Sequence, residues 1–93
     1  MPKQLLESLK VPNSDDRIVL YDYPPGGGTS ANLHRVSPAG ETVWTADLPD
    51  YGGADAYVTV SFQSDALIAN SFSCFQVVLD VETGRIRESV FTK

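Results

Sequence analysis

The sequence predicts an all-β fold, an antiparallel β-meander of about seven strands with a short N-terminal helix. Two observations predict it. Residues 56–91 contain four short apolar runs, YVTVSF, ALIANSF, CFQVVLDV and RIRESVF, separated only by turns. Residues 17–48 contain three more runs of the same kind. Short β-branched and aromatic runs between turn residues are typical of strands. With 93 residues, the chain is expected to be one domain with one core.

The helix is expected over residues 1–10. Pro2 suits the first turn of a helix, and Leu5, Leu6 and Leu9 recur at helical spacing with charged residues between them. The helix should end before Val11-Pro12, because the residue before a proline avoids helical geometry. We expect it to lie over the strands as a lid.

The first unit, residues 17–48, is predicted to hold three strands. The last two are joined by Ser37-Pro38-Ala39-Gly40, whose proline and glycine fit a tight turn. Alternation places Trp44, Ala46 and Leu48 on one face, toward the core. The only tryptophan is expected to pack against a set of apolar residues of the second unit: Phe62, Phe75, Val77 and Leu79.

The second unit, residues 56–91, is predicted to hold four strands. Residues 67–72 are apolar on both faces, which indicates a strand in the middle of a sheet. Glu82-Thr83-Gly84 fits a hairpin loop with glycine in the left-handed conformation. The two units could pack as a two-layer sandwich or form one strongly coiled sheet.

Two segments of the chain repeat one pattern. VSPAGETVW (residues 36–44) and LDVETGRIRE (residues 79–88) both run from an apolar residue through a turn with glycine into a returning strand. They resemble the blades of quinoprotein-type and WD-like β-propellers, in which a segment such as LDVETG joins the two outer strands. About 1.75 blades of roughly 40 residues would be present, too few to close a propeller ring. The resemblance therefore implies local β-meander architecture but no quinone cofactor.

Composition narrows the classes of function. The net charge of −5 and the lack of a basic stripe argue against nucleic-acid binding. No apolar run approaches membrane-spanning length, and the charged residues among the N-terminal leucines argue against a secretory signal. Cys74 is the only cysteine, so no internal disulfide can form, and we expect a partly buried, inert thiol. We expect a cytoplasmic protein.

No motif of known chemistry is present in the sequence. His34 is the only histidine, and no serine has a GxSxG context. The glycines of PPGGGTS are not followed by the GK[ST] of a phosphate loop. Asp15 and Asp16 fit a capping role in a polar loop better than a metal site. We therefore expect no enzyme, no cofactor and no metal.

Two hypotheses of function remain. The first is a non-catalytic protein-interaction module, whose candidate surface residues are Tyr21, Tyr23, Tyr51, Tyr57 and His34. Tyrosine is enriched in recognition surfaces, although these tyrosines could equally flank the core. The second is a small-ligand binder or minor enzyme with a cleft formed by the loops at residues 24–30 and 49–54, beside His34.

A homodimer is also expected. The run RIVLYDY, residues 17–23, is apolar on both faces at its centre and would form an unguarded edge strand that a second copy could pair with. The monomeric alternative is that the N-terminal helix covers this edge through its leucines.

Overall fold

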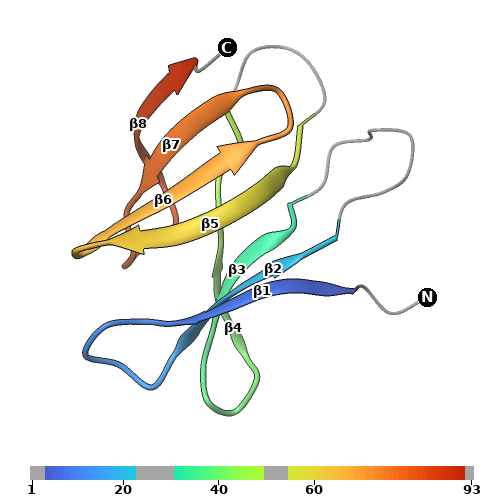
Figure 1. The fold of residues 1–93 in the computed structure, drawn as a ribbon. Coiled ribbons are helices and arrows are strands. Elements are labelled where there is room, and N and C mark those ends of the chain that lie inside the picture. Colours follow the sequence, from blue (N-terminus) through green and yellow to red (C-terminus); the bar gives the residue numbers. More distant parts are fainter. Residues whose placement is uncertain (1–3, 23–30, 50–54, 92–93) are drawn as a thin grey trace.

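The chain forms two four-stranded antiparallel sheets (Figure 1). A computed structural model describes residues 4–22, 31–49 and 55–91. The first sheet has the order β1 (Leu5–Lys10), β2 (Arg17–Tyr21), β3 (Leu33–Val36) and β4 (Thr42–Thr45). The second has the order β5 (Tyr57–Gln63), β6 (Ala66–Ser71), β7 (Phe75–Leu79) and β8 (Ile86–Phe91). The predicted all-β class and the four strands of the second unit are confirmed.

The predicted N-terminal helix is wrong. Residues 5–10 form β1, which pairs antiparallel with β2, so the described chain has eight strands rather than seven. The three strands predicted in residues 17–48 are present, and β1 joins them as the fourth strand of the first sheet. As a strand this segment satisfies the open hydrogen-bonding edge of β2, which a helix could not do. Leu9 packs against the core, whereas Leu5 and Leu6 stay 50% and 41% exposed. Strand pairing with β2 therefore determines the structure of this segment, despite the helical spacing of its leucines.

The hydrophobic core lies between the two sheets, with β5 crossing over β1 and β2 (Figure 1). Trp44 is 8% exposed and belongs to one core cluster with the residues expected around it, which confirms its predicted burial. The largest fully buried apolar side chains of the cluster come from both sheets: Ile18, Leu20, Leu33, Tyr57, Leu67 and Val77. The two units therefore form a sandwich, one of the two arrangements expected.

Both predicted hairpin turns are present. The amide of Gly40 donates to the carbonyl of Ser37 at 2.9 Å, and Gly40 has a φ of +87°. Gly84 has a φ of +77°, the left-handed conformation expected of it. The second hairpin also packs on the first sheet, because Gly84 lies directly beneath the indole ring of Trp44.

Polar side chains join the two sheets at buried positions. The amide group of Asn32, which is fully buried, donates to the carbonyls of Tyr21 at 2.7 Å and Tyr57 at 2.8 Å, and its oxygen accepts from the amide of Tyr57 at 3.0 Å. Asn32 thus continues the hydrogen-bonding pattern of a strand across the gap between the sheets. A buried side chain satisfied in this way fixes how the two layers meet.

A second polar connection lies at the turn between β7 and β8. The carbonyl of Val81 accepts from the indole nitrogen of Trp44 at 2.8 Å and from Arg35 Nη1 at 2.8 Å. The amide of Asp47 donates to the carbonyl of Gly84 at 3.0 Å. The turn at residues 80–85 is therefore held against β3 and β4. Among the residues described here, no helix is long and apolar enough to span a bilayer.

Candidate functional site

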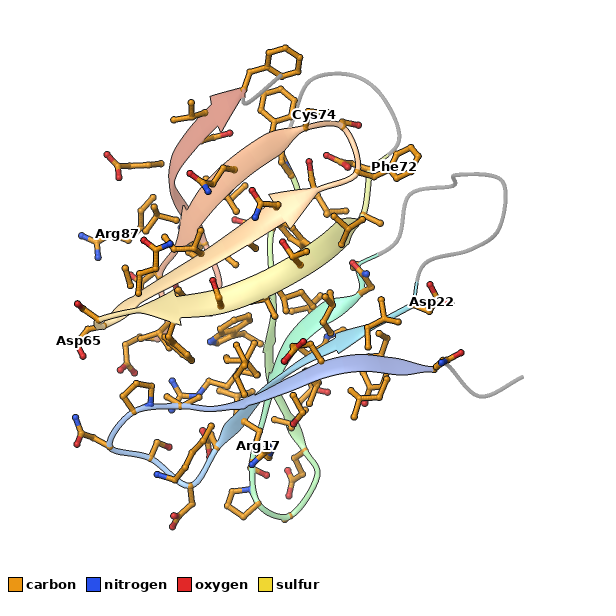
Figure 2. All side chains as sticks on the ribbon, in the orientation of Figure 1. Arg17, Asp22, Asp65, Phe72, Cys74 and Arg87 are labelled. Carbon is orange, nitrogen blue, oxygen red and sulfur yellow. The ribbon has the colours of Figure 1, made fainter. Side chains whose placement is uncertain are left out.

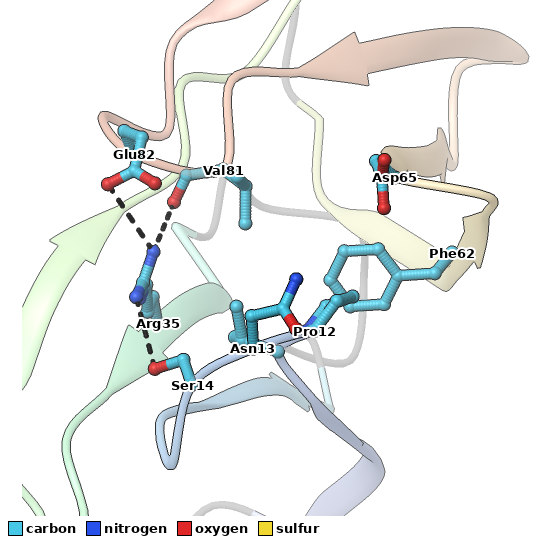
Figure 3. Close-up of a pocket in the computed structure, with 9 residues that line it drawn as sticks. Pro12, Asn13, Ser14, Arg35, Phe62, Asp65, Val81 and Glu82 are labelled. Atoms are coloured by element: carbon cyan, nitrogen blue, oxygen red, sulfur yellow. Dashed lines mark hydrogen bonds and ion pairs between the residues drawn. The ribbon is translucent and has the colours of Figure 1, made fainter.

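A pocket of about 410 Å³ opens between the two sheets at one end of the sandwich (Figure 3). Three turns meet there: residues 11–16 between β1 and β2, residues 64–65 between β5 and β6, and residues 80–85 between β7 and β8. The lining residues come from these turns and from the adjoining strands: Val11, Pro12, Asn13, Ser14, Arg35, Phe62, Asp65, Val81 and Glu82. Both sheets contribute, so the pocket exists only in the assembled sandwich.

The loop at residues 11–16 forms one wall and is held by its own hydrogen bonds. The amide of Val11 donates to the carbonyl of Asp16 at 3.0 Å, and the amide of Ser14 donates to the carbonyl of Val11 at 3.2 Å. The hydroxyl of Ser14 accepts from the amide of Asp16 at 3.1 Å. Asn13 takes a φ of +60°, which asparagine tolerates better than most residues. This wall is therefore preformed.

Arg35 lies at the back of the pocket, and its guanidinium is already bonded. Its Nε donates to Asp16 Oδ2 at 2.8 Å, and its Nη1 donates to the carbonyl of Val81 at 2.8 Å. Its side chain is only 11% exposed, while Glu82 Oε2 lies 4.0 Å from Nη1. Its Nη2 also donates to Ser14 Oγ at 3.4 Å, so three of the five N–H donors of the guanidinium hold the turns at residues 11–16 and 80–85 in place.

The pocket combines apolar walls with acidic side chains at its rim. Figure 3 shows Phe62 and Asp65 on one side and Arg35 with Glu82 on the other. Asp16 and Glu82 lie beside the guanidinium of Arg35, and Asp65 lies across the pocket, so these three carboxylates and one guanidinium leave two negative charges in excess. Glu82 and Asp65 are both exposed at the surface. The electrostatic environment therefore favours a positive charge.

The pocket is not the cleft that the sequence predicts. Its loops, residues 24–30 and 49–54, lie outside the described residues except for Pro49, and His34 does not line the pocket. Sequence reasoning did not find the pocket because its walls come from three turns far apart in the chain. The one local signal was the sequence Val11-Pro12-Asn13-Ser14, a turn whose proline and valine would present apolar surface.

Two predicted surface residues come together on the outer face of the first sheet. The rings of Tyr21 and His34 lie with centroids 5.9 Å apart, tilted by 57°. His34 Nδ1 hydrogen-bonds the hydroxyl of Thr45 at 2.9 Å, across the β3–β4 pair. The strand register places Leu5 directly opposite Tyr21, and Val43 flanks the inward-facing Trp44. This outer face therefore carries an aromatic pair with Leu5 beside it, and Val43 lies two residues before Thr45 on β4.

The other tyrosines are not part of this face. Tyr57 lies entirely in the core, with its hydroxyl donating to the carbonyl of Asp47. Burial raises the pKa of Tyr57 well above its usual value, and the nearby carboxylates of Asp55 and Asp47 raise it further. Tyr23 and Tyr51 lie outside the described residues. Tyr57 thus has the core role that was the alternative for the tyrosines.

A third feature is the apolar end of the second sheet, opposite the pocket. Phe72, Val90 and Phe91 are all more than half exposed, and the rings of Phe75 and Phe91 lie with centroids 5.3 Å apart. Figure 2 shows Cys74 and Phe72 near one turn at this end. Cys74 is exposed, not partly buried as expected, and has a φ of +72°. Within the described ranges, no three His, Cys, Asp or Glu side chains gather as metal ligands would.

Comparison with known proteins shows which family the chain resembles. A family model described as "Domain of unknown function (DUF7957)" matches residues 7–91, which spans both sheets from β1 to the end of β8. No curated protein and no solved structure matches the chain.

Proposed function

This chain belongs to the DUF7957 family, and we propose that it is a non-catalytic, cytoplasmic protein-interaction module that binds its partner on the outer face of the first sheet. The observation that carries the proposal is the aromatic pair Tyr21–His34. Leu5, opposite Tyr21 on β1, and Val43, on β4, are about half exposed. We name these four residues, with Thr45, the outer face. Partly exposed aromatic rings and half-exposed aliphatic side chains beside hydrogen-bonding groups are the composition of protein interfaces.

The shape of the outer face supports a protein partner in preference to a small molecule. Its residues lie on four neighbouring strands, and none of them lines the pocket. Small-molecule sites are concave and enclose most of the ligand, whereas protein partners cover broad surfaces. Tyr21 and His34 lose little side-chain entropy on binding, because they already contact each other and His34 is bonded to Thr45.

Site-specific photocrosslinking tests this proposal. A photoreactive residue placed at Leu5 or Val43 reports on the outer face, and the same residue at Thr59 or Gln76 reports on the exposed surface of the second sheet. In extracts of the native host, we expect a discrete adduct from the first pair only. Excess unlabelled parent protein should suppress the adduct, and an excess of a Tyr21→Ser, His34→Ser variant should not. Equal adducts from all four positions would contradict the proposal.

The expected homodimer remains a separate question for solution measurement. It was based on residues 17–23 as an open edge, and β2 is instead paired with β1 on one side and β3 on the other. The N-terminal segment thus covers this edge, as in the monomeric alternative, but as a strand. Sedimentation at micromolar concentration gives the answer, because a single species of about 10 kDa would reject the dimer.

A further inference from the structure

We propose that the pocket between the three turns binds a cationic alkyl group, either an alkylammonium or an alkylguanidinium. This site is separate from the outer face and does not depend on the function proposed for it. Its volume of about 410 Å³ lies within the range of small-ligand sites, roughly 300–1,000 Å³. It can therefore hold a short aliphatic stem with a charged head.

The walls of the pocket suit the stem of such a group. Val11, Pro12 and Val81 supply aliphatic surface, and Phe62 supplies an aromatic ring. Phe62 also packs against the core cluster, so this wall is firmly supported. An aliphatic chain is stabilised by contact with such surface, and a cation near an aromatic face gains further attraction.

The rim suits the charged head. Asp65 is on the Phe62 side and Glu82 is on the Arg35 side, so a cation entering the pocket would pass between two carboxylates (Figure 3). The positive charge of Arg35 does not cancel this attraction, because Asp16 pairs with it at 2.8 Å. Asn13 adds a side-chain oxygen that can accept a hydrogen bond from the head.

An anionic ligand fits the same geometry poorly. Nε, Nη1 and Nη2 of Arg35 already donate to Asp16, to the carbonyl of Val81 and to Ser14, so only part of the guanidinium remains for an anion. It would also approach two exposed carboxylates of its own sign. The charge of the pocket therefore selects for a cation.

Amide chemical-shift titration of the intact protein tests the inference with defined probes. The cationic probes are butylammonium and butylguanidinium, and the matched neutral and anionic probes are butan-1-ol and butanoate. We expect saturable shifts at residues 13–14, 65 and 82 with the cations only, and weaker binding as salt rises from about 0.02 M to about 0.5 M. No saturable shift with either cation, or equal affinity for butan-1-ol, would overturn the proposal.

Two double variants distinguish the effect of the rim carboxylates from the effect of the protein's net charge. Asp65→Asn with Glu82→Gln removes the two rim carboxylates and should lower the affinity for the cations about three- to tenfold. Glu41→Gln with Glu88→Gln removes two exposed acids outside the pocket and changes the net charge equally, so its affinity should stay close to that of the parent. Equal losses in the two variants would show that net charge alone attracts the cation and would overturn the site.

The same titration identifies the source of the cation. Lysine and arginine blocked at both termini carry the same charged groups as butylammonium and butylguanidinium, but attached to a peptide backbone. Tighter binding of the capped residues than of the free alkyl cations would point to a basic side chain of a protein. Tighter binding of the free alkyl cations would point to a small amine.

Discussion

Gly84 is the residue at which the β7–β8 hairpin meets the core. A Cβ atom built there would lie 2.5 Å from Trp44 Cε3, and the φ of +77° is itself unfavourable for other residues. Gly40 has a similar φ of +87°, but open space around its Cβ position. Substitutions at the two glycines therefore distinguish the cost of backbone strain from the cost of a steric clash with Trp44.

We expect Gly84→Ala to lower the free energy of unfolding by about 3 to 5 kcal/mol, from left-handed strain plus overpacking against the indole. Gly40→Ala should cost only about 1 to 2 kcal/mol, because strain acts alone there. Urea unfolding of both variants measures the difference. Equal costs at the two sites would show that Trp44 moves aside without penalty.

Tyr57 makes stability sensitive to alkaline pH. Its pKa is raised in the folded state, so the folded protein holds this proton more tightly than the unfolded chain does. The contribution of Tyr57 to stability is fully present below about pH 10 and decreases as pH rises further, by about 1.4 kcal/mol per pH unit. Acidic conditions leave this contribution unchanged.

The variant Tyr57→Phe tests this linkage. At pH 8 it should be less stable than the parent by about 1 kcal/mol, because the carbonyl of Asp47 loses a buried hydrogen bond. Between pH 8 and pH 11 the gap should narrow by about 1 kcal/mol, since the variant has no phenol to ionise at this position. Urea unfolding at the two pH values checks it, and an unchanged gap would contradict the raised pKa.

At the scale of elements, the strands of the second sheet were predictable, whereas β1 was not. Alternation and turn residues are local signals, and residues 56–91 carry them throughout. The leucines of residues 5–10 have helical spacing. The free edge of β2 nevertheless needs a strand to pair with, and the residues of this segment do not by themselves indicate that need. Tyr57, a candidate surface residue, is buried for a related reason: an irregularity between Tyr57 and Thr59 breaks the alternation of the strand.

The role of β1 as an edge cover predicts the effect of removing it. Deletion of residues 1–10 would expose the backbone groups of β2 and part of the core beneath Leu9. We expect the shortened chain to self-associate at micromolar concentration, because an unpaired apolar edge pairs with other chains. Sedimentation compares it with the intact protein and with a control that lacks only residues 1–3. A shortened chain that sediments as the intact protein does would contradict this role.

At the scale of the whole molecule, the pocket was beyond prediction because it depends on how the two sheets are placed against each other. Alternation indicates which side of a strand is buried, but it does not specify the angle or offset between layers. That placement is set by buried polar connections, those of Asn32 and of the Arg35–Val81–Trp44 group. An isolated asparagine at residue 32 gives no sequence signal of such a role.

Asn32 therefore provides the sharpest test of how the sandwich is held together. In Asn32→Ala, the carbonyls of Tyr21 and Tyr57 and the amide of Tyr57 lose their side-chain partner, and we expect a loss of about 3 kcal/mol or more in the free energy of unfolding. Asn70→Ala removes one hydrogen bond to Thr59 at the surface and should cost about 1 kcal/mol or less. Asn32→Asp keeps the acceptor for the Tyr57 amide but loses both donated bonds, so it should also be strongly destabilised. Urea unfolding ranks the three variants, and similar costs for Asn32→Ala and Asn70→Ala would show that apolar packing alone fixes the two sheets.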